Sequence, residues 1–398
     1  MAIPADTKEL LGFDYYNIFE ANLSDKQRET RDRVREWVQN RVLPTINPYW
    51  EKAEFPFELF YEMKDLGIMG GALTEYGCAG LDVVEAGLVA YELSKGDGSI
   101  CTGYGVHSGL ALGTIGYLAS DEQKERWMPG LVNMEKIGAF GLTEPTVGSN
   151  AAGIKTTAKR DGDYYILNGA KRWIGNASIS NILIVWARDD EGKIGAFVVE
   201  DAPETEGVSM ENIFGKVAKR AVLNAEIHFD NVKVPVENRL DKVRSFRDAA
   251  MVLFNGRYGV SWEAAGCAAG AFEHALKYAL EREQFGKPIA GFQLIQEKLV
   301  EMASEVTAMQ AMCWQLAENA QRGTLTEAMS SMAKYHNARK ARRVTELARE
   351  TLGGNGIAIE NHIARLWTDA EVIYTYEGSN EINMLIVGRD ITGMNAFV

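Results

Sequence analysis

The C-terminal part of the chain carries apolar residues spaced alternately four and three positions apart, and this spacing constrains its fold strongly. The apolar positions are Ile295, Leu299, Met302, Val306, Met309, Cys313 and Leu316. They fall on one face of an α-helix, which predicts a long helix packed in a helical bundle. Gly323 is expected to end this helix, and Thr324 with Glu327 predicts a capping box that starts the next one.

Two segments with other periodicities precede this bundle. From about residue 138 the chain carries short runs rich in β-branched and aromatic residues, at 164–167, 182–186, 196–199 and 225–229. Asp-Gly and Asn-Gly pairs flank several of these runs, which is typical of a small antiparallel β domain.

The first segment has a helical pattern. Ser24 with Gln27 predicts the start of a helix that Pro44 should end. Further helices are expected at about 57–67, 83–95, 108–118 and 121–131. The three periodicities together predict domains at 1–137, 138–239 and 240–398.

The composition argues against several classes of protein. The 398 residues include 42 Lys and Arg against 55 Asp and Glu, a formal charge of −13, which argues against nucleic acid as a partner. Membrane insertion is not expected, because no apolar run approaches the roughly 20 residues of a membrane helix. The 4 cysteines and 5 histidines are scattered, which predicts neither a disulfide framework nor a metal site. Without a signal-peptide pattern or a peroxisomal signal at 395–398, we expect a cytoplasmic protein, with an organelle matrix as the alternative.

Two segments around the β domain suit a planar or phosphorylated ligand. The loop 140–149 has two glycines, two hydroxyls and a proline, so its backbone N–H groups could hold a polar ring or a phosphate, or it could simply connect two elements. Trp173 stands beside Gly175 at the end of a predicted strand. Its indole could lie against a planar cofactor, or it could fill the core.

The C-terminal part carries three more candidates. Arg282 suits a pyrophosphate, or lies at the solvated end of a helix–helix loop. The glycines of 352–356 allow close approach of a ligand, or cap a helix. Glu377 directly follows Tyr376 and stands three positions after Tyr374. Two flanking aromatic residues predict a partly desolvated carboxylate with a raised pKa, suited to act as a base; the alternative is an acidic helix cap.

Taken together and in this order, these segments resemble those of the acyl-CoA dehydrogenase flavoprotein family, and the resemblance covers nearly the whole chain. The matching segments read F-G-L-T-E-P-x-x-G-S at 140–149, W-I-G-N at 173–176, R-x-Q-F-G at 282–286, L-G-G-N-G at 352–356 and Y-E-G-S at 376–379. The sequence is most similar to the glutaryl-CoA dehydrogenases and the plant short-chain acyl-CoA oxidases. The resemblance implies an α+β fold with an N-terminal helical domain, a middle antiparallel β domain and a C-terminal four-helix bundle, assembled as a homotetramer.

The resemblance also implies an activity. Glu377 would remove the α-proton of a short- or medium-chain acyl-CoA thioester while the β-hydrogen leaves as hydride to N5 of FAD, giving a trans-2-enoyl-CoA. Electrons would pass to an electron-transfer flavoprotein. The residues implied to contact FAD are Phe140, Leu142, Thr143, Gly148, Ser149, Trp173, Ile174, Gly175, Arg282, Gln284, Phe285, Gln293, Gly353, Gly354, Ser379 and Glu381. Of these, Arg282, Gln284, Phe285, Gln293, Gly353 and Gly354 would serve the FAD of a neighbouring subunit. The residues implied to contact the substrate are Ser149, Arg257, Tyr376 and Gly378.

Four positions depart from the family pattern. Ser94 and Cys101 stand where glutaryl-CoA dehydrogenases hold the distal carboxylate with a glutamate and an arginine, so glutaryl-CoA is expected to be a poor substrate. Gly175 replaces a hydroxyl residue that bonds flavin N5, opening space near the ring, a feature shared with the plant oxidases; an oxidase that uses O₂ is therefore the alternative. Glu350 replaces a frequent Gln, which puts one contact to the adenosine half in doubt. A non-catalytic scaffold that binds FAD or CoA is a third hypothesis.

Overall fold

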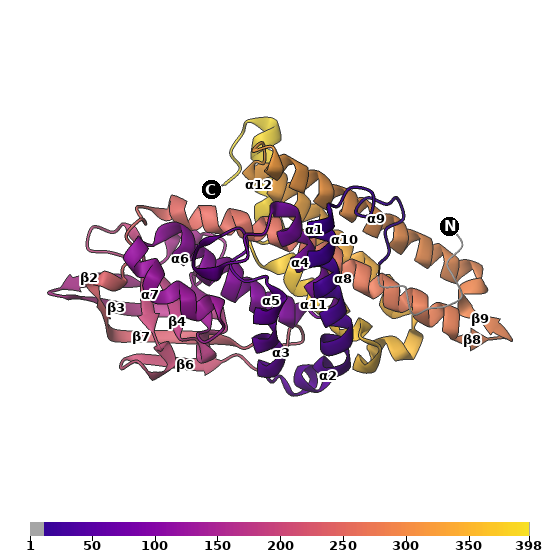
Figure 1. The fold of residues 1–398 in the computed structure, drawn as a ribbon, viewed down its shortest axis with the longest axis horizontal. Coiled ribbons are helices and arrows are strands. Elements are labelled where there is room, and N and C mark those ends of the chain that lie inside the picture. The colour runs from indigo at the N-terminus through magenta and orange to yellow at the C-terminus, as the bar shows by residue number, and fades with distance from the viewer. Residues whose placement is uncertain (1–11, 398) are drawn as a thin grey trace.

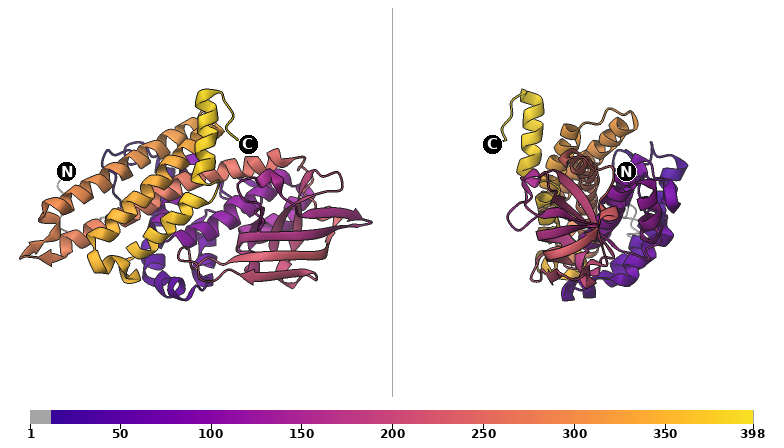
Figure 2. Two further views of the ribbon diagram at one scale, coloured as in Figure 1. Left: turned by 180° about the vertical axis from the view of Figure 1, so that it is seen from behind. Right: turned by 90° about the vertical axis from the view of Figure 1, so that its left-hand side faces the viewer.

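The computed structural model describes residues 12–397, which form three packed parts (Figure 1). A β domain occupies one end, a bundle of long helices extends to the other, and the N-terminal helices lie across the middle and along the β domain. Figure 2 shows from behind that the first long helix of the bundle runs from the β domain to the far tip. Residues 1–11, on which the expectation of no signal peptide partly rests, lie outside the described residues.

The N-terminal part is helical, as predicted. Its α-helices are α1 (Asp25–Trp37), α2 (Leu43–Lys52), α3 (Phe57–Glu62), α4 (Val83–Gly96), α5 (Gly98–Tyr104), α6 (Gly113–Leu118) and α7 (Asp121–Val132). The π-helical segment η5 (Gly105–Leu112) continues α5 into α6, so the helix expected at 108–118 starts earlier than predicted. Ser24 and Gln27 form the predicted capping box of α1.

Pro44 does not end the first helix, contrary to the prediction. The π-helical turn η2 (Val38–Val42) continues α1 into α2, with the Leu43 N–H bonded to the Val38 carbonyl. Pro44 then falls in the first turn of α2, where its missing N–H needs no partner.

The middle part is a seven-stranded sheet. Its strands are β1 (Gly138–Gly141), β2 (Thr157–Asp161), β3 (Tyr164–Gly175), β4 (Ile182–Arg188), β5 (Ile194–Glu200), β6 (Val208–Asn212) and β7 (Asn224–Pro235). The order is β1-β4-β2-β3-β7-β6, with β5 on β4. Antiparallel pairing predominates as predicted, but β1 and β2 both run parallel to β4. The register of β3 on β7 slips between Lys171 and Ile174, which marks a β-bulge.

The C-terminal part is the predicted helical bundle. It contains α8 (Phe246–Glu281), α9 (Gln293–Gln321), α10 (Glu327–Thr351), α11 (Ile363–Thr375) and α12 (Asn380–Thr392), and the short hairpin strands β8 (Glu283–Gln284) and β9 (Lys287–Pro288). The apolar face of α9 is buried from Met302 to Leu316. Gly323 follows the end of α9 with φ of +69°, as expected.

The capping box predicted at Thr324 is wrong. The N-cap of α10 is Thr326, whose hydroxyl oxygen accepts a hydrogen bond from the Met329 N–H at 3.2 Å. The Thr324 hydroxyl instead donates to the Asn319 carbonyl at 3.2 Å, closing the turn after α9. The two threonines stand so close in sequence that spacing alone does not distinguish them.

The sequence predicts neither a disulfide framework nor a metal site, and it does not predict membrane insertion. Cys78, Cys101, Cys267 and Cys313 are all free thiols. Within residues 12–397, no group of three or more His, Cys, Asp or Glu side chains could hold a metal ion. No helix of the described chain is long and apolar enough to cross a membrane.

Candidate active site

Glu377 lies in the turn that joins α11 to α12. Its backbone is left-handed, with φ of +54°, and Gly378 follows with φ of +80°. A non-glycine residue adopts this conformation at a cost of about 1–3 kcal/mol, so the surrounding structure must hold the turn. Ser379 begins α12, where its hydroxyl oxygen accepts a hydrogen bond from the Ile382 N–H at 3.3 Å.

The Glu377 carboxylate is poorly solvated. Among the residues that the structure describes, its buried Oε2 has no hydrogen-bond partner. Burial raises the pKa of Glu377 to about 7; the charges of Arg257 and Lys334 oppose this rise, and the Glu263 carboxylate adds to it. A base with a pKa near neutrality is matched to proton abstraction at neutral pH. The desolvation expected from the sequence is thus confirmed.

Two adjacent residues of α8 face this carboxylate. A Cβ added at Gly256 would stand 2.6 Å from Glu377 Oε2, so only a glycine leaves room for it. Arg257 is buried, and its Nη1 lies 2.5 Å from Oε1 of Glu327. Its Nε has no partner in the described chain and would lie 3.8 Å from a Cβ at Gly378. The fold therefore brings together three of the residues predicted to form the site: Glu377, Arg257 and Gly378.

Lys334 of α10 holds the Glu377 turn against the bundle. Its Nζ donates to the carbonyl of Tyr374 at 2.9 Å and to that of Gly378 at 3.0 Å, one on each side of Glu377. The side chain is fully buried. Burial lowers the pKa of Lys334 to about 8, and the nearby Glu377 carboxylate opposes that shift.

Tyr376, predicted as a substrate contact, has its hydroxyl in a buried polar cluster. The hydroxyl donates to Glu263, with Oε2 at 2.5 Å and Oε1 at 2.6 Å, and accepts from Lys219 Nζ at 2.5 Å. Burial raises the pKa of Tyr376 well above its ordinary value, so the hydroxyl stays protonated. Its ring lies under Lys219, with Nζ 4.5 Å from the centroid.

The loop 140–149 is held by one buried carboxylate. Glu144 accepts hydrogen bonds from the N–H groups of Lys155 at 2.7 Å and Thr156 at 2.9 Å, and from Lys171 Nζ at 2.9 Å. Lys171 also donates to the Leu142 carbonyl at 3.0 Å. Of the residues predicted to bind FAD here, Phe140 and Leu142 are buried, Thr143 is half-buried, and Gly148 and Ser149 are exposed.

The β-bulge of β3 turns Trp173 outward. Trp173 has φ of +65° and is 52% exposed, so it does not fill the core. Ile174 and Gly175 are buried behind it. The space expected at Gly175 is partly filled, because a Cβ there would stand 3.1 Å from Cγ2 of Val106 on η5.

A second group of predicted residues lies at the far tip of the bundle, by β8 and β9 (Figure 1). Arg282, Gln284, Gly353 and Gly354 line one open pocket there, together with Glu350. Phe285 is 94% exposed beside it, and Gln293 begins α9. Glu350 is paired with Lys298, with Nζ 2.6 Å from Oε2.

The predicted FAD-binding residues of one chain therefore form two groups, one at the tip and one made up of the β-domain residues with Ser379 and Glu381. Glu381 accepts a hydrogen bond from the Tyr374 hydroxyl at 3.2 Å. A flavin dinucleotide fits the residues of both groups. The exposed Trp173 ring offers a flat face. At Gly354 and Gly353, a Cβ would meet no atom of the described chain within 4 Å, which leaves their backbone open to a ligand.

Sequence reasoning missed four buried charged residues around the site: Lys171, Lys219, Glu263 and Lys334. Lys334 stands four residues before the buried Ala338, so helical spacing places it on the buried face of α10. Lys171 stands four residues after Leu167, an even spacing that puts both on one face of a strand. We find no such signal for Lys219, which lies in a loop.

Family models match three consecutive stretches of the chain. They describe the N-terminal domain of acyl-CoA dehydrogenase at residues 24–135, the middle domain at 139–232 and the C-terminal domain at 246–392. The chain therefore belongs to the acyl-CoA dehydrogenase family of flavoprotein oxidoreductases.

Individual members of the family are similar over almost their whole length. An acyl-CoA dehydrogenase of Bacillus subtilis is 35% identical over 94% of this chain and 99% of its own. The crystal structure of a glutaryl-CoA dehydrogenase from Mycobacterium smegmatis in complex with FADH2 is 34% identical, with a TM-score of 0.92 over 96% of this chain and 98% of that one. Butyryl-CoA dehydrogenase from Megasphaera elsdenii is 34% identical, with a TM-score of 0.87 over 93% of this chain and 99% of that one.

Proposed function

We propose that this protein oxidises a short- or medium-chain acyl-CoA to the trans-2-enoyl-CoA, with Glu377 as the base that removes the α-proton. The observation that carries the proposal is the buried Glu377 Oε2, which has no partner in the described chain and belongs to a carboxyl group with a pKa of about 7. A thioester α-proton is only weakly acidic, so its removal needs a base that is poorly solvated and oriented in advance.

The other residues near Glu377 would orient the substrate and stabilise charge. Arg257, with a free Nε, would contact the CoA-bearing substrate, and Gly378 leaves room beside the base. The Glu377 N–H would donate to the thioester carbonyl oxygen, where negative charge develops as the proton leaves. Ser149 and Tyr376 complete the proposed substrate contacts.

FAD is the proposed cofactor, and when bound it supplies the acceptor for the hydride that leaves the β-carbon. Trp173, Ile174 and the loop 140–149 would hold its ring, and the remaining predicted residues its ribose and phosphates. The tip residues Arg282, Gln284, Gly353 and Gly354 lie far along the bundle from Glu377, which supports the proposal that they serve a neighbouring subunit of a homotetramer (Figure 1).

We propose an electron-transfer flavoprotein as the electron acceptor. The oxidase alternative rests on Gly175, which provides no side-chain donor near the ring. Val106 occupies part of the space that this glycine leaves, which favours the dehydrogenase. Hydrogen peroxide released in step with turnover of butyryl-CoA in air would identify an oxidase instead.

Product analysis with the FAD-loaded protein tests the proposal. Butyryl-CoA and an artificial electron acceptor should yield trans-2-butenoyl-CoA, and the Glu377→Gln variant should retain FAD while losing most of this activity. Purified protein that contains no flavin, or that leaves a panel of acyl-CoA thioesters unchanged, would favour the scaffold hypothesis.

A further inference from the structure

A buried polar cluster that includes the Tyr376 hydroxyl joins all three parts of the chain. It consists of Lys219, Glu263, Tyr376 and Thr102, which we call the Lys219 cluster. Lys219 Nζ donates to Oε1 of Glu263 at 2.5 Å, to the Tyr376 hydroxyl at 2.5 Å and to the Thr102 hydroxyl at 2.7 Å. Thr102 comes from α5, Lys219 from the β6–β7 loop, and Glu263 and Tyr376 from the bundle.

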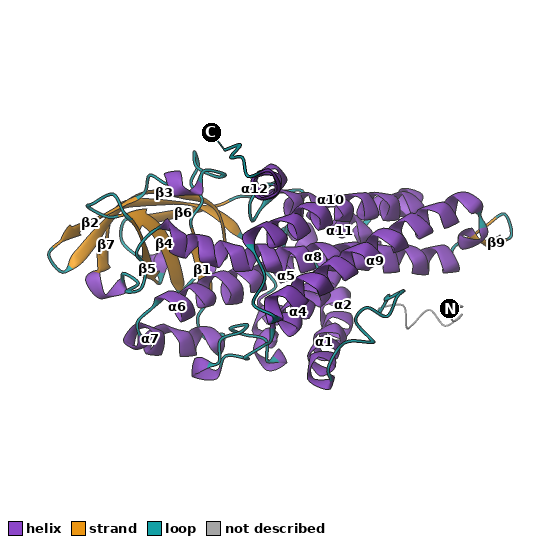
Figure 3. Ribbon diagram, turned by 90° about the horizontal axis from the view of Figure 1, so that it is seen from above, coloured by secondary structure: helices purple, strands orange, loops and turns teal. Residues whose placement is uncertain are grey.

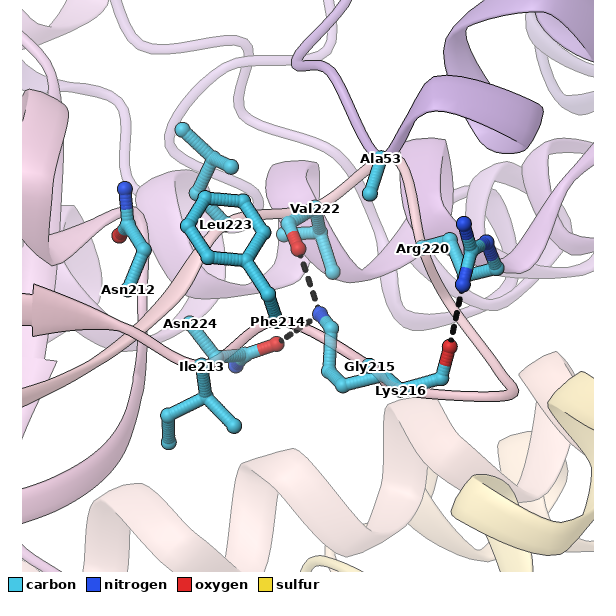
Figure 4. A pocket seen from close by; sticks show the side chains of 10 residues that line it. All are labelled: Ala53, Asn212, Ile213, Phe214, Gly215, Lys216, Arg220, Val222, Leu223 and Asn224. Carbon is cyan, nitrogen blue, oxygen red and sulfur yellow. Dashed lines mark hydrogen bonds between the residues drawn. The ribbon is translucent and has the colours of Figure 1, made fainter.

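The β6–β7 loop is built to present Lys219 inward. Lys219 has φ of +44°, and its N–H donates to Oδ1 of Asp369 at 2.5 Å. Lys216 stabilises the loop through three hydrogen bonds. Its Nζ donates to the carbonyls of Lys219 at 3.0 Å and Val222 at 2.6 Å, and to Oδ1 of Asn224 at 2.6 Å. Figure 4 shows Lys216 reaching Val222 and Asn224 across the pocket under this loop.

The cluster lies between the turn that carries the base and a helix face that contacts the Trp173 strand. Tyr376 directly precedes Glu377, and the Glu263 charge contributes to the raised pKa of Glu377. Thr102 is half-buried and stands about one helical turn before Val106, which lies 3.1 Å from a Cβ at Gly175. An acyl chain that extends from a thioester beside Glu377 along this helix face would therefore meet the Thr102 end of the cluster.

The cluster has no free charge to offer a substrate. Within the described chain, all three N–H donors of Lys219 are taken by Glu263, Tyr376 and Thr102. The Glu263 carboxylate cancels the lysine charge at 2.5 Å. Lys219 is also close enough to Cys101 to oppose the rise in the pKa of its thiol, so the fold places a cation near Cys101, but one that is already neutralised.

Two consequences follow for the acyl chain. A distal carboxylate that reached the cluster would be buried without an available donor or an uncompensated cation, which is unfavourable. A long hydrocarbon chain would end against charged and hydroxyl groups, where it gains little by leaving water.

We propose that the Lys219 cluster closes the far end of the acyl site and restricts the substrate to short acyl groups without a distal charge. This inference rests on the proposed dehydrogenation of an acyl-CoA.

The first test removes the neutralising charge. Glu263→Gln keeps the shape of the side chain but removes the carboxylate that balances the Lys219 charge most strongly and leaves only the nearby Asp369. The ratio of kcat/KM for glutaryl-CoA to that for butyryl-CoA should therefore rise about tenfold or more. A ratio is the right readout, because any change in the pKa of Glu377 affects both substrates alike. The control is Glu273→Gln, which removes a buried carboxylate on the same helix, 2.8 Å from Lys95, and should leave the ratio unchanged.

The second test makes the cluster apolar. The double variant Lys219→Met and Glu263→Leu should raise kcat/KM for hexanoyl-CoA and octanoyl-CoA relative to butyryl-CoA. Circular dichroism and FAD content check that both variants fold and load their cofactor. If Glu263→Gln misfolds, the double variant, which removes both charges of the Lys219–Glu263 pair together, still tests the inference.

The outcomes separate the inference from the proposed function. Wild-type protein that oxidises octanoyl-CoA or glutaryl-CoA as well as butyryl-CoA, or folded variants with unchanged substrate ratios, would overturn the role of the cluster but leave the dehydrogenation intact. Wild-type protein that oxidises no acyl-CoA would overturn the proposed function itself.

Discussion

The carboxylate of Glu377 lies against the bare backbone of Gly256 on α8. A Cβ at Gly256 would stand 2.6 Å from Oε2 and 3.0 Å from Cδ of Glu377, closer than atoms can approach without displacement. The position of the proposed base thus depends on a residue 121 positions earlier in the chain that has no side chain at all.

Gly256→Ala should impair catalysis without weakening the fold. The added methyl group must displace the carboxylate, and a displaced base typically lowers the turnover rate by one or two orders of magnitude, about 1.4 kcal/mol for each tenfold loss. Alanine favours the helix over glycine, so the Tm should not fall greatly. Steady-state turnover of butyryl-CoA and thermal unfolding measure the two effects.

Gly259→Ala is the matched control on the same helix. A Cβ at Gly259 meets no atom of residues 12–397 within 4 Å, so this variant should keep wild-type turnover. Equal turnover in both alanine variants would show that the Glu377 carboxylate does not need its place over Gly256.

Lys334→Met should move the pH dependence of turnover to higher pH. The Lys334 charge lowers the pKa of Glu377, which burial raises to about 7, so removing that charge raises the pKa further. Glu377 must be deprotonated to act as a base, and activity therefore rises with pH through this pKa. The variant should be slowest relative to wild type below about pH 7, where the base is mostly protonated in both proteins. The two should converge above about pH 8, where Lys334 itself, with a pKa of about 8, loses its charge.

Lys334→Arg, which keeps the charge, should restore the position of the pH profile at least in part. Arg342→Met, on the same helix, removes a partly exposed pair with Glu371 and should leave the profile in place. A Lys334→Met variant that is slower by the same factor at every pH would mean that Lys334 only supports the fold.

Much of the fold was predictable because it is local. Ser24 and Gln27 cap α1 through contacts within one turn, and the apolar spacing of α9 reports directly on the face that it buries. The predictions were wrong where another segment of the chain determines the local structure. Pro44 continues a helix because a π-helical turn precedes it, and β1 pairs in parallel with β4, a partner that no local pattern specifies.

The site was predictable only in part, and for a related reason. Motifs indicated Glu377 and the loop 140–149, because their residue types stand out within a few consecutive positions. The residues that tune the base come from distant segments. Gly256 and Glu263 lie on α8 and Lys334 on α10, and only the tertiary structure brings them to the Glu377 carboxylate.

Lys171→Met should weaken retention of FAD. The lysine donates to Glu144 and to the Leu142 carbonyl, so its loss leaves a buried carboxylate without its cation and loosens the loop 140–149. The expected cost is about 3–5 kcal/mol, shared between stability and cofactor affinity. Absorbance of the flavin after dialysis measures the loss. The control is Lys155→Met, because Lys155 holds Glu144 through its backbone N–H and its side chain is exposed.

Arg282→Ala tests whether the bundle tip serves a neighbouring subunit. Arg282 is exposed and lies with Gly353 and Gly354 around the open tip pocket, so truncation should barely alter the Tm of the apoprotein. FAD affinity should fall by roughly tenfold or more if the arginine pairs with a phosphate. Unchanged FAD affinity would show that the tip pocket is not part of the cofactor site.

The central claim is that Glu377, whose carboxyl group has a pKa of about 7, removes the α-proton of the substrate. The most direct measurement is the single-turnover rate of butyryl-CoA oxidation by FAD-loaded protein, from about pH 6 to about pH 8.5, in wild type and Glu377→Gln. We predict a wild-type rate that rises with pH through one ionisation near 7, and a Glu377→Gln rate lower by about two to four orders of magnitude with no such ionisation. A Glu377→Gln protein that retains the wild-type rate and pH profile would contradict the account.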